Sequence, residues 1–247
     1  MESSYFQFTR ESEDPAARLF CFHCAGGSPY AYAPWEKFID PRIDIFPFQM
    51  SGRCGRKREC YASSIEAAAL EAAEQIKDCA DRKIYLTGHS MGGVVAHYTA
   101  YLLKQLYGIR TEKLFITASV PDLGSSIRDN YGSTDRYDDN RFCEMLLGFG
   151  AVDSKIIRIR QFREQFLPII RSDFTLIGNY HADPTNVIDS DISVFCGDCD
   201  KIVSRAACCE WKNYTKGKVD ITELSGGHFF INEHVKEICG EINRCVS

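Results

Sequence analysis

The 247-residue sequence contains no stretch approaching 18 consecutive apolar residues, so no transmembrane helix is expected. Its 29 lysines and arginines are spread along the chain rather than gathered in blocks, so nothing indicates a nucleic-acid-binding surface. Internal repeats, low-complexity tracts and a clear interdomain linker are also missing. Since hydrophobic residues make up 45% and charged residues 26%, with a net charge of −5, the composition is that of a mildly acidic globular protein.

Cysteine is too scarce for a disulfide scaffold, with twelve in the whole chain. The first residues, MESSYFQFTRESED, have neither a basic start nor an apolar run, so we expect a cytoplasmic protein with reduced thiols. Cys21 with Cys24 and Cys196 with Cys199 have the spacing of metal ligands. However, Cys21 and Cys196 lie inside apolar runs, where a free cysteine acts as a small hydrophobic residue. We therefore expect no metal.

Short apolar runs alternate with segments of helical periodicity, which is typical of βαβ units and a mostly parallel sheet. The sequence thus predicts the α/β class. Helices are expected at 63–79, where apolar residues recur at three- and four-residue spacing, and at 94–106, before Gly108. The predicted strands are 18–23, 43–48, 83–88, 113–118, 191–196 and 218–224.

One connection is much longer than an ordinary crossover. Residues 122–188 separate two predicted strands and contain helical patterns at 140–147, 154–165 and 167–177. In α/β enzymes an insertion at the carboxyl end of a strand usually covers the active site. We therefore expect one domain over 1–247, with a core of 1–121 and 189–247 and a helical lid insertion at about 122–188.

Gly88-His89-Ser90-Met91-Gly92 fits the G-x-S-x-G pattern and lies between a predicted strand and a predicted helix. In such a nucleophile elbow, glycines allow the close backbone approach of a sharp turn that projects the serine hydroxyl above the sheet. Ser90 is therefore the predicted nucleophile.

A serine hydroxyl is a weak nucleophile and needs a general base that a carboxylate orients. Asp198 and Asp200 both follow the predicted strand 191–196, at the edge of the sheet where Ser90 lies. Asp200 is the preferred acid because it lies further from the strand, and Asp198 remains the alternative.

His228 follows the last predicted strand and completes the chain order serine, acid, histidine. The other candidates for the base are His234, in the expected final helix, and His181, in the insertion, and neither ends a strand. The oxyanion hole requires two backbone N–H groups, one from the residue after the nucleophile and one from a loop after an early strand. Met91 supplies the first, and we assign the second to Ala25, beside Gly26 and Gly27.

These motifs belong to a wider pattern, because nearly all of the chain resembles the type II thioesterases of nonribosomal peptide and polyketide synthesis. Fatty-acid-synthase medium-chain thioesterases are similar as well. GHSMGG occurs in many hydrolases, whereas R-S-D-F and GGHFF are more specific to the family. The matching segments are LFCFHCAGGSPYAYAPW (19–35), SGRCGRKRE (51–59), YLTGHSMGGVVAHYTAYLL (85–103), FLPIIRSDFTLIGNY (166–180), FCGDCDKIV (195–203) and GGHFFI (226–231). The chain departs from the family pattern at His23, Cys24 and Ser51, which puts loop rigidity and acyl preference in question.

The resemblance implies an α/β-hydrolase fold with a helical lid. It also implies a triad of Ser90, Asp200 and His228, with Ala25 and Met91 as the oxyanion hole. The implied reaction is hydrolysis of acyl or aminoacyl thioesters from the phosphopantetheine arm of an acyl or peptidyl carrier protein, which clears stalled or misprimed synthetase modules. No cofactor is implied, and the protein is expected to be a monomer.

Three other functions use the same scaffold. A small-ester hydrolase or lipase would share the triad, and an acyltransferase or cyclase would be identical in its catalytic residues. A non-catalytic receptor would be expected to have lost a triad member. If a carrier domain with an acidic face is the partner, its docking surface should be locally basic. Two segments qualify, one with Arg53, Arg56, Lys57 and Arg58, and one with Lys155, Arg158, Arg160 and Arg163.

Overall fold

A computed structural model describes residues 4–6 and 9–246 of the chain, and its centre is a six-stranded sheet. All neighbouring strands are parallel, in the order β2-β1-β3-β4-β5-β6. The strands are β1 (Ala17–Phe22), β2 (Ile43–Pro47), β3 (Lys83–His89), β4 (Lys113–Thr117), β5 (Asp191–Gly197) and β6 (Val219–Leu224). Each predicted strand is present with its ends shifted by no more than one residue, which confirms the α/β class.

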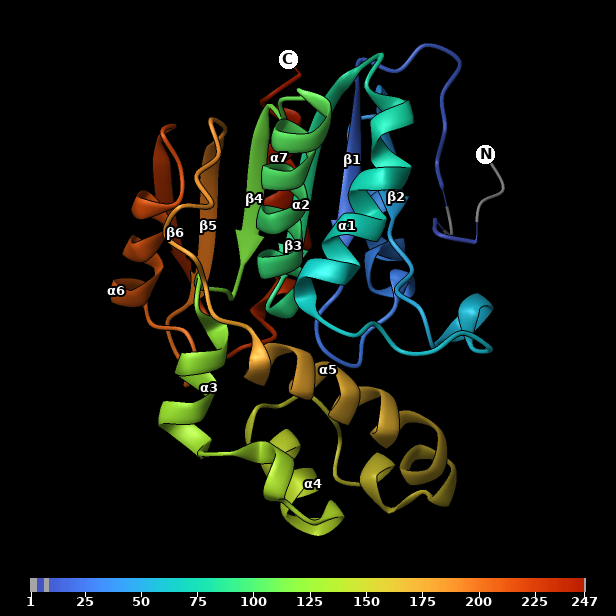
Figure 1. Cartoon of the computed structure of the whole chain (residues 1–247), viewed down its shortest axis with the longest axis vertical. Helices are drawn as coiled ribbons and strands as arrows, with labels where there is room; N and C mark the ends of the chain where they lie inside the picture. The colour runs from blue at the N-terminus through green and yellow to red at the C-terminus, as the bar shows by residue number, and fades with distance from the viewer. Residues whose placement is uncertain (1–3, 7–8, 247) are drawn as a thin grey trace.

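Helices cover both faces of the sheet (Figure 1). Phe20 and Leu86 belong to the buried cluster of α1 and α2, whereas Leu19 and Tyr85, one position earlier in each strand, pack with the 3-10 helix η1 and with α7. Because both faces are buried, the inner strands are nearly continuous apolar runs, whereas the edge strand β6 (VDITEL) alternates and is partly exposed. The elements around the sheet are η1 (Pro29–Lys37), η2 (Cys54–Arg56), α1 (Ile65–Ile76), η3 (Lys77–Cys79), α2 (Met91–Tyr107), α6 (Arg205–Cys208), η7 (Cys209–Asn213), η8 (Phe230–Asn232) and α7 (Val235–Asn243).

The two long core helices begin and end where local chemistry favours it. Ser64 caps α1, since its hydroxyl accepts a hydrogen bond from the N–H of Ala67 at 3.1 Å. Gly108 ends α2 with a φ of +66°, a left-handed conformation that glycine adopts without steric cost. Among the described residues, no helix has both the length and the apolar character that a bilayer crossing requires.

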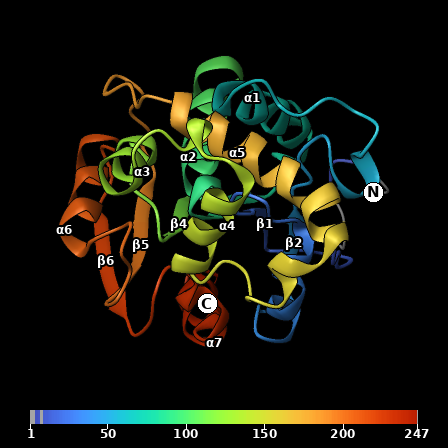
Figure 2. The same cartoon turned by 90° about the horizontal axis from the view of Figure 1, so that it is seen from below.

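The chain between β4 and β5 crosses the edge of the sheet where the strands end (Figures 1 and 2). We call residues 122–188 the lid segment. Its helices are α3 (Leu123–Tyr131), α4 (Asp139–Gly148) and α5 (Leu167–Asn179), joined by short turns that include η4 (Thr134–Arg136). The helical patterns at 140–147 and 167–177 are thus confirmed as α4 and α5.

Two features of the lid segment differ from expectation. Helix α3 was not predicted, because its apolar pattern is weak. The local sequence feature that marks its start is Asp122, whose carboxylate accepts a hydrogen bond from the N–H of Ser125 at 2.9 Å. The single helix predicted for 154–165 is wrong. A 3-10 turn (η5, Ile156–Arg158) is followed by Ile159 in an extended conformation, and a helical stretch that includes a π-helical turn (η6, Phe162–Phe166) begins only at residue 160. Three β-branched isoleucines in this stretch lower its helix propensity.

Candidate active site

Ser90 lies at the sharp turn between β3 and α2, with a φ of +54° and a ψ of −119°. This conformation is strained for a residue with a side chain, at a cost of about 1–3 kcal/mol. The flanking glycines are required by space. A Cβ on Gly88 would lie 2.0 Å from the carbonyl oxygen of Gly92, and a Cβ on Gly92 would lie 2.0 Å from that of Phe22. The motif therefore forms the elbow that its sequence predicted.

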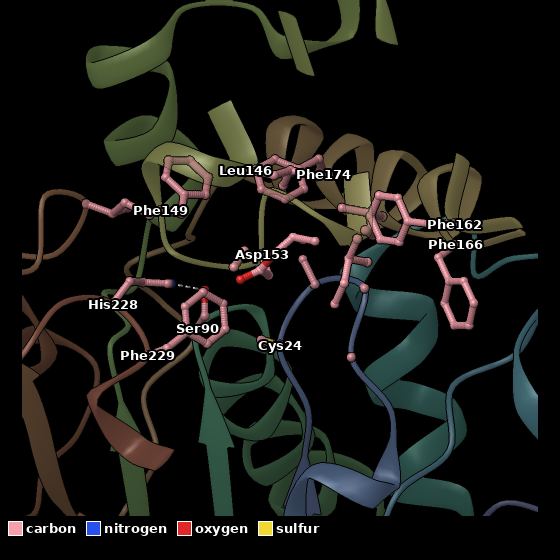
Figure 3. Close-up of a pocket in the computed structure, with 18 of the residues that line it drawn as sticks. Cys24, Ser90, Leu146, Phe149, Asp153, Phe162, Phe166, Phe174, His228 and Phe229 are labelled. Carbon is pink, nitrogen blue, oxygen red and sulfur yellow. Dashed lines mark hydrogen bonds between the residues drawn. The ribbon is translucent and has the colours of Figure 1, made fainter. Parts of the chain in front are cut away.

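The three predicted triad side chains meet above the carboxyl ends of their strands. His228 Nε2 lies 2.9 Å from Ser90 Oγ (Figure 3), and His228 Nδ1 lies 2.8 Å from Asp200 Oδ2. The side chain of His228 is 6% exposed and that of Asp200 is fully buried. Because the carboxylate accepts the Nδ1 proton, the lone pair of Nε2 faces the serine hydroxyl. In this arrangement Ser90 donates its hydrogen bond to the imidazole.

Asp200, and not Asp198, is the aspartate that contacts His228. The second oxygen of Asp200, Oδ1, accepts hydrogen bonds from the N–H groups of Ile202 at 2.8 Å and Val203 at 3.2 Å. Asp198 is exposed and instead accepts a hydrogen bond from the N–H of Gly226 at 2.8 Å, which lowers the pKa of its carboxyl group. Asp200 is therefore held in place by the backbone of its own loop.

The alternative histidines lie elsewhere. His234 hydrogen-bonds to Ser225, and the exposed His181 lies 4.0 Å from a carboxylate oxygen of Asp122. Neither contacts Ser90 in the described part of the chain.

A second histidine supports the base and was not identified from the sequence. The ring of His89 lies 5.4 Å from that of His228, centroid to centroid. His89 Nδ1 donates to Thr117 Oγ1 at 3.0 Å, since that hydroxyl itself donates to the carbonyl of Gly88. Burial holds the pKa of His89 well below its usual range, with a smaller effect from the nearby His228. A neutral His89 therefore places no competing positive charge beside the imidazole of His228.

Two backbone N–H groups beside Ser90 remain without an acceptor. Within residues 4–6 and 9–246, neither Ala25 nor Met91 donates its N–H to another protein group. Met91 begins α2, where the helix dipole favours negative charge. Ala25 lines the same cavity as Ser90. Both predicted oxyanion donors are thus free of protein acceptors in the described structure.

Ser90 opens into a cavity of about 610 Å³ between the sheet edge and the lid segment (Figure 3). This volume lies within the range of small-molecule sites, about 300–1,000 Å³. The polar side chains on its wall, besides Ser90 and His228, are those of Asp153 and Gln161. The apolar ones are Ile127, Leu146, Phe149, Val152, Ile156, Ile159, Phe162, Phe166, Ile170, Phe174, Ile177, Ile202 and Phe229. The wall suits a hydrocarbon chain.

Of the two cysteine pairs, only Cys24 lines the cavity beside Ser90. Cys21 and Cys196 are buried in β1 and β5, as expected of small hydrophobic residues. Across the described residues, no group of three or more histidine, cysteine or acidic side chains could hold a metal ion. That the protein uses no metal or cofactor stays a prediction.

The first predicted basic surface is present only in part, because Lys57 and Arg58 are exposed whereas Arg53 and Arg56 are buried. Arg53 is 2% exposed and forms an ion pair with Asp173, with Nη2 2.6 Å from Oδ1. Arg56 is 3% exposed and pairs with Glu71 at 2.6 Å. These guanidinium groups are neutralised inside the protein, so the charge count of the 53–58 segment overstates its surface charge.

The basic residues of the lid segment are more exposed. The side chain of Arg160 is 88% exposed and pairs with Glu164 one helical turn later. Arg163 instead supports the lid segment, since it donates to the carbonyl of Ile157 and to Asn140 Oδ1, each at 3.0 Å. The exposed charges at this edge therefore come chiefly from Lys155, Arg158 and Arg160.

Comparison with known proteins agrees with this geometry. The sequence matches the family profile described as a thioesterase domain over residues 17–246. It is 27% identical over 230 residues to the thioesterase PikA5 of Streptomyces venezuelae, covering 92% of this chain and 80% of that protein. It is 30% identical over 237 residues to a probable cadicidin biosynthesis thioesterase of Streptomyces griseus, covering 94% of this chain and 63% of that protein.

A solved structure has the same fold. The RedJ thioesterase from the prodiginine biosynthetic pathway of Streptomyces coelicolor superposes with a TM-score of 0.80 at 25% identity, over 92% of this chain and 86% of that one. The α/β-hydrolase fold and the resemblance to type II thioesterases of nonribosomal peptide and polyketide pathways are thereby confirmed. Because the family profile extends over nearly the whole chain, the protein belongs to the thioesterase family and is an enzyme that hydrolyses thioesters.

Proposed function

We propose that this enzyme removes acyl or aminoacyl groups from the phosphopantetheine arm of carrier proteins by a Ser-His-Asp mechanism, and so clears stalled or misprimed synthetase modules. The observation that carries the proposal is the hydrogen-bonded chain from Ser90 through His228 to Asp200, which faces an apolar cavity of about 610 Å³. That cavity would hold the acyl chain, with the thioester carbon at Ser90.

In the first half of the reaction, Ser90 Oγ forms a bond to the thioester carbonyl carbon while His228 Nε2 takes the serine proton. The N–H groups of Ala25 and Met91 donate to the oxyanion of the tetrahedral intermediate. Asp200 stabilises the imidazolium that forms. The C–S bond then breaks, and His228 returns the proton to the departing sulfur. A thiol with a pKa near 8.5 is a good leaving group, so this protonation is less demanding than for an amine.

In the second half, a water molecule attacks the acyl group on Ser90. His228 Nε2 takes the water proton, the same N–H groups hold the second oxyanion, and the proton passes to Ser90 Oγ as the acid departs. Each step uses residues of this chain and water. We therefore propose that no metal or dissociable cofactor takes part.

The central experiment compares substrates and a nucleophile variant. We expect an acyl group on a carrier protein to be hydrolysed faster than the same group on coenzyme A or as a simple ester. Ser90→Ala should lower the rate by roughly 10⁴- to 10⁶-fold while the melting temperature stays unchanged. A sulfonyl fluoride should modify Ser90 in the wild type, as located by mass spectrometry. Substantial activity in folded Ser90→Ala would overturn the mechanism, and a preference for simple esters would favour a small-ester hydrolase.

We further propose that the carrier protein docks at the lid segment, where Arg158 and Arg160 are exposed beside the cavity. A carrier with an acidic face would be attracted by these charges. Arg158→Glu with Arg160→Glu should raise KM for the acyl-carrier substrate at low salt and leave a small acyl thioester unaffected. Lys83→Glu with Lys218→Glu is the matched control, because these exposed lysines lie at the opposite edge of the sheet. Equal effects of the two variants would place docking elsewhere.

An acyltransferase or cyclase would use the same residues, with a nucleophile of the substrate in place of water. Free acid as the product, measured against transferred or cyclised product, supports hydrolysis. We propose that the enzyme acts as a monomer in the cytoplasm, where its twelve free thiols would remain reduced. Sedimentation of the purified protein and fractionation of cells would test these two proposals.

A further inference from the structure

A buried ion pair outside the triad joins the lid segment to the loop of Ala25. Asp173, on α5, is fully buried and binds Arg53 through two hydrogen bonds of 2.6 Å, one to each carboxylate oxygen. Asp173 Oδ2 also accepts the N–H of Gly26 at 2.7 Å. A single carboxylate therefore ties together three segments that are distant in the sequence, and the hydrolytic steps described above leave it without a role.

The loop of Ala25 also packs against α5 at a second residue, Ile170. Gly26 has a φ of +70°, and a Cβ on it would lie 2.4 Å from Cγ1 of Ile170. Ile170 precedes Asp173 by three residues, so both lie on the same face of the helix. The helix thus holds Gly26 by a hydrogen bond from Asp173 and by close packing against Ile170.

This contact decides which N–H of the loop is free. The N–H of Gly26 is taken by Asp173, and that of Gly27 donates to the carbonyl of Cys24 at 2.9 Å. Ala25 is left with an N–H that has no acceptor among the described residues, at the wall of the cavity. Arg53 also donates to the carbonyl of Gly27 at 3.4 Å, so it contacts the loop directly as well.

We propose that Arg53 and Asp173 are positioning residues that hold the Ala25 N–H as an oxyanion donor, and that α5 and the loop of residues 24–27 move as one unit. The inference rests on the proposed mechanism, in which Ala25 serves as that donor. A buried ion pair is a weak source of stability, because desolvation of both charges offsets their attraction. Positioning of the loop of Ala25 would explain the presence of this buried pair, which its small contribution to stability does not.

The first test is Asp173→Asn, which keeps the shape of the side chain and removes its charge. Loss of one oxyanion donor lowers kcat by about 10²- to 10³-fold in other enzymes, and we expect a loss approaching that range with little change in KM. The inhibition constant of an alkyl trifluoromethyl ketone, whose adduct with Ser90 carries an oxyanion, should rise by the same factor. A purely structural role would lower the melting temperature without this parallel change.

The matched control is Glu71→Gln. Glu71 pairs with Arg56, a second buried arginine of the same loop, at 2.6 Å, and Arg56 makes no hydrogen bond to residues 24–27 in the described structure. This variant should leave kcat, KM and the inhibition constant within about threefold of wild type. If Asp173→Asn behaved like Glu71→Gln, the proposal would be overturned.

A double variant, Arg53→Met with Asp173→Leu, separates stability from positioning. Apolar residues of similar volume often replace a buried ion pair without loss of stability. We expect the melting temperature to return to that of wild type while kcat and the binding of the trifluoromethyl ketone stay low, because Gly26 still lacks its acceptor. Recovery of kcat together with stability would refute the positioning role. Failure of the proposed function would appear differently, as activity retained in Ser90→Ala.

Discussion

Replacing Asp200 by asparagine probes the catalytic acid with a side chain of nearly the same shape. In the structure one carboxylate oxygen accepts from the N–H groups of Ile202 and Val203, and the other accepts from His228 Nδ1 at 2.8 Å. Asparagine has one acceptor oxygen. Leaving a buried donor without a partner costs about 1–3 kcal/mol, so the two backbone N–H groups will hold that oxygen on their side.

The amide NH₂ of the new side chain must then face His228. Because an NH₂ group cannot accept the Nδ1 proton, the imidazole shifts its proton to Nε2, and Nε2 can no longer accept the proton of Ser90. This change of tautomer costs about 10⁴ in kcat in other triads, which corresponds to roughly 5 kcal/mol. KM should change little, since the cavity that holds the acyl chain is untouched.

The assay is release of the free thiol from an acyl thioester, followed at saturating substrate. Asp198→Asn is the control, since Asp198 accepts the N–H of Gly226 through Oδ1, a bond that an amide oxygen can keep. Its kcat should stay within about threefold of wild type. The reasoning fails if folded Asp200→Asn retains more than about a tenth of wild-type kcat. It also fails if Asp198→Asn is the more damaging change.

Three further outcomes are expected. Gly92→Ala should destabilise the protein by about 3 kcal/mol or more in urea unfolding, because its Cβ would lie 2.0 Å from the carbonyl oxygen of Phe22; Gly240→Ala, with nothing within 4 Å, should stabilise α7 by about 0.5–1 kcal/mol. For acyl chains on a carrier, kcat/KM should rise up to about fourfold per methylene until the cavity is filled, from roughly 0.8 kcal/mol per buried CH₂, and a flat profile would place the chain elsewhere. The free energy of unfolding should fall as the pH drops below 6.5, because three histidines bind protons in the unfolded chain but stay neutral when buried in the folded one. The combined slope is up to about 4 kcal/mol per pH unit, and His97→Gln should remove about a third of this slope in urea unfolding measured from pH 7 to pH 4.5. Burial lowers the pKa of each of these histidines, His23 and His97 to about 4 and His89 well below its usual range.

The sheet and the triad could be predicted because their signals are local. A strand buried on both faces is a nearly continuous apolar run, whatever its neighbours are, and the inner strands of the sheet follow this pattern. The edge strand β6 alternates instead and is partly exposed. The elbow was predicted from its five-residue pattern. Backbone atoms of the same turn require the glycine at 88, whereas the carbonyl of Phe22 on β1 requires the one at 92. His228 and the two candidate acids, Asp198 and Asp200, followed from one topological fact, that residues after parallel strands gather at one edge of the sheet. The contact between Asp200 and His228 then decided between the two acids.

The lid segment shows where local signals end. Helical periodicity predicted a helix at 154–165, but Ile159 is extended there and interrupts it. The sequence also marked Arg53 as a surface charge, because an arginine in a polar loop is usually exposed.

What the sequence by itself determined was the succession of strands and helices along the chain, the elbow at Ser90 and the base His228, because each depends on a local pattern or on the direction of a strand. The choice of Asp200 over Asp198 as the acid was decided by the structure. Only the tertiary structure decided that Arg53 is buried against Asp173, 120 residues away, and that their pair takes the N–H of Gly26. The physical reason is that a charged side chain is buried only where a partner of opposite charge lies beside it. Here that partner is distant in the sequence, so no local sequence pattern can specify it.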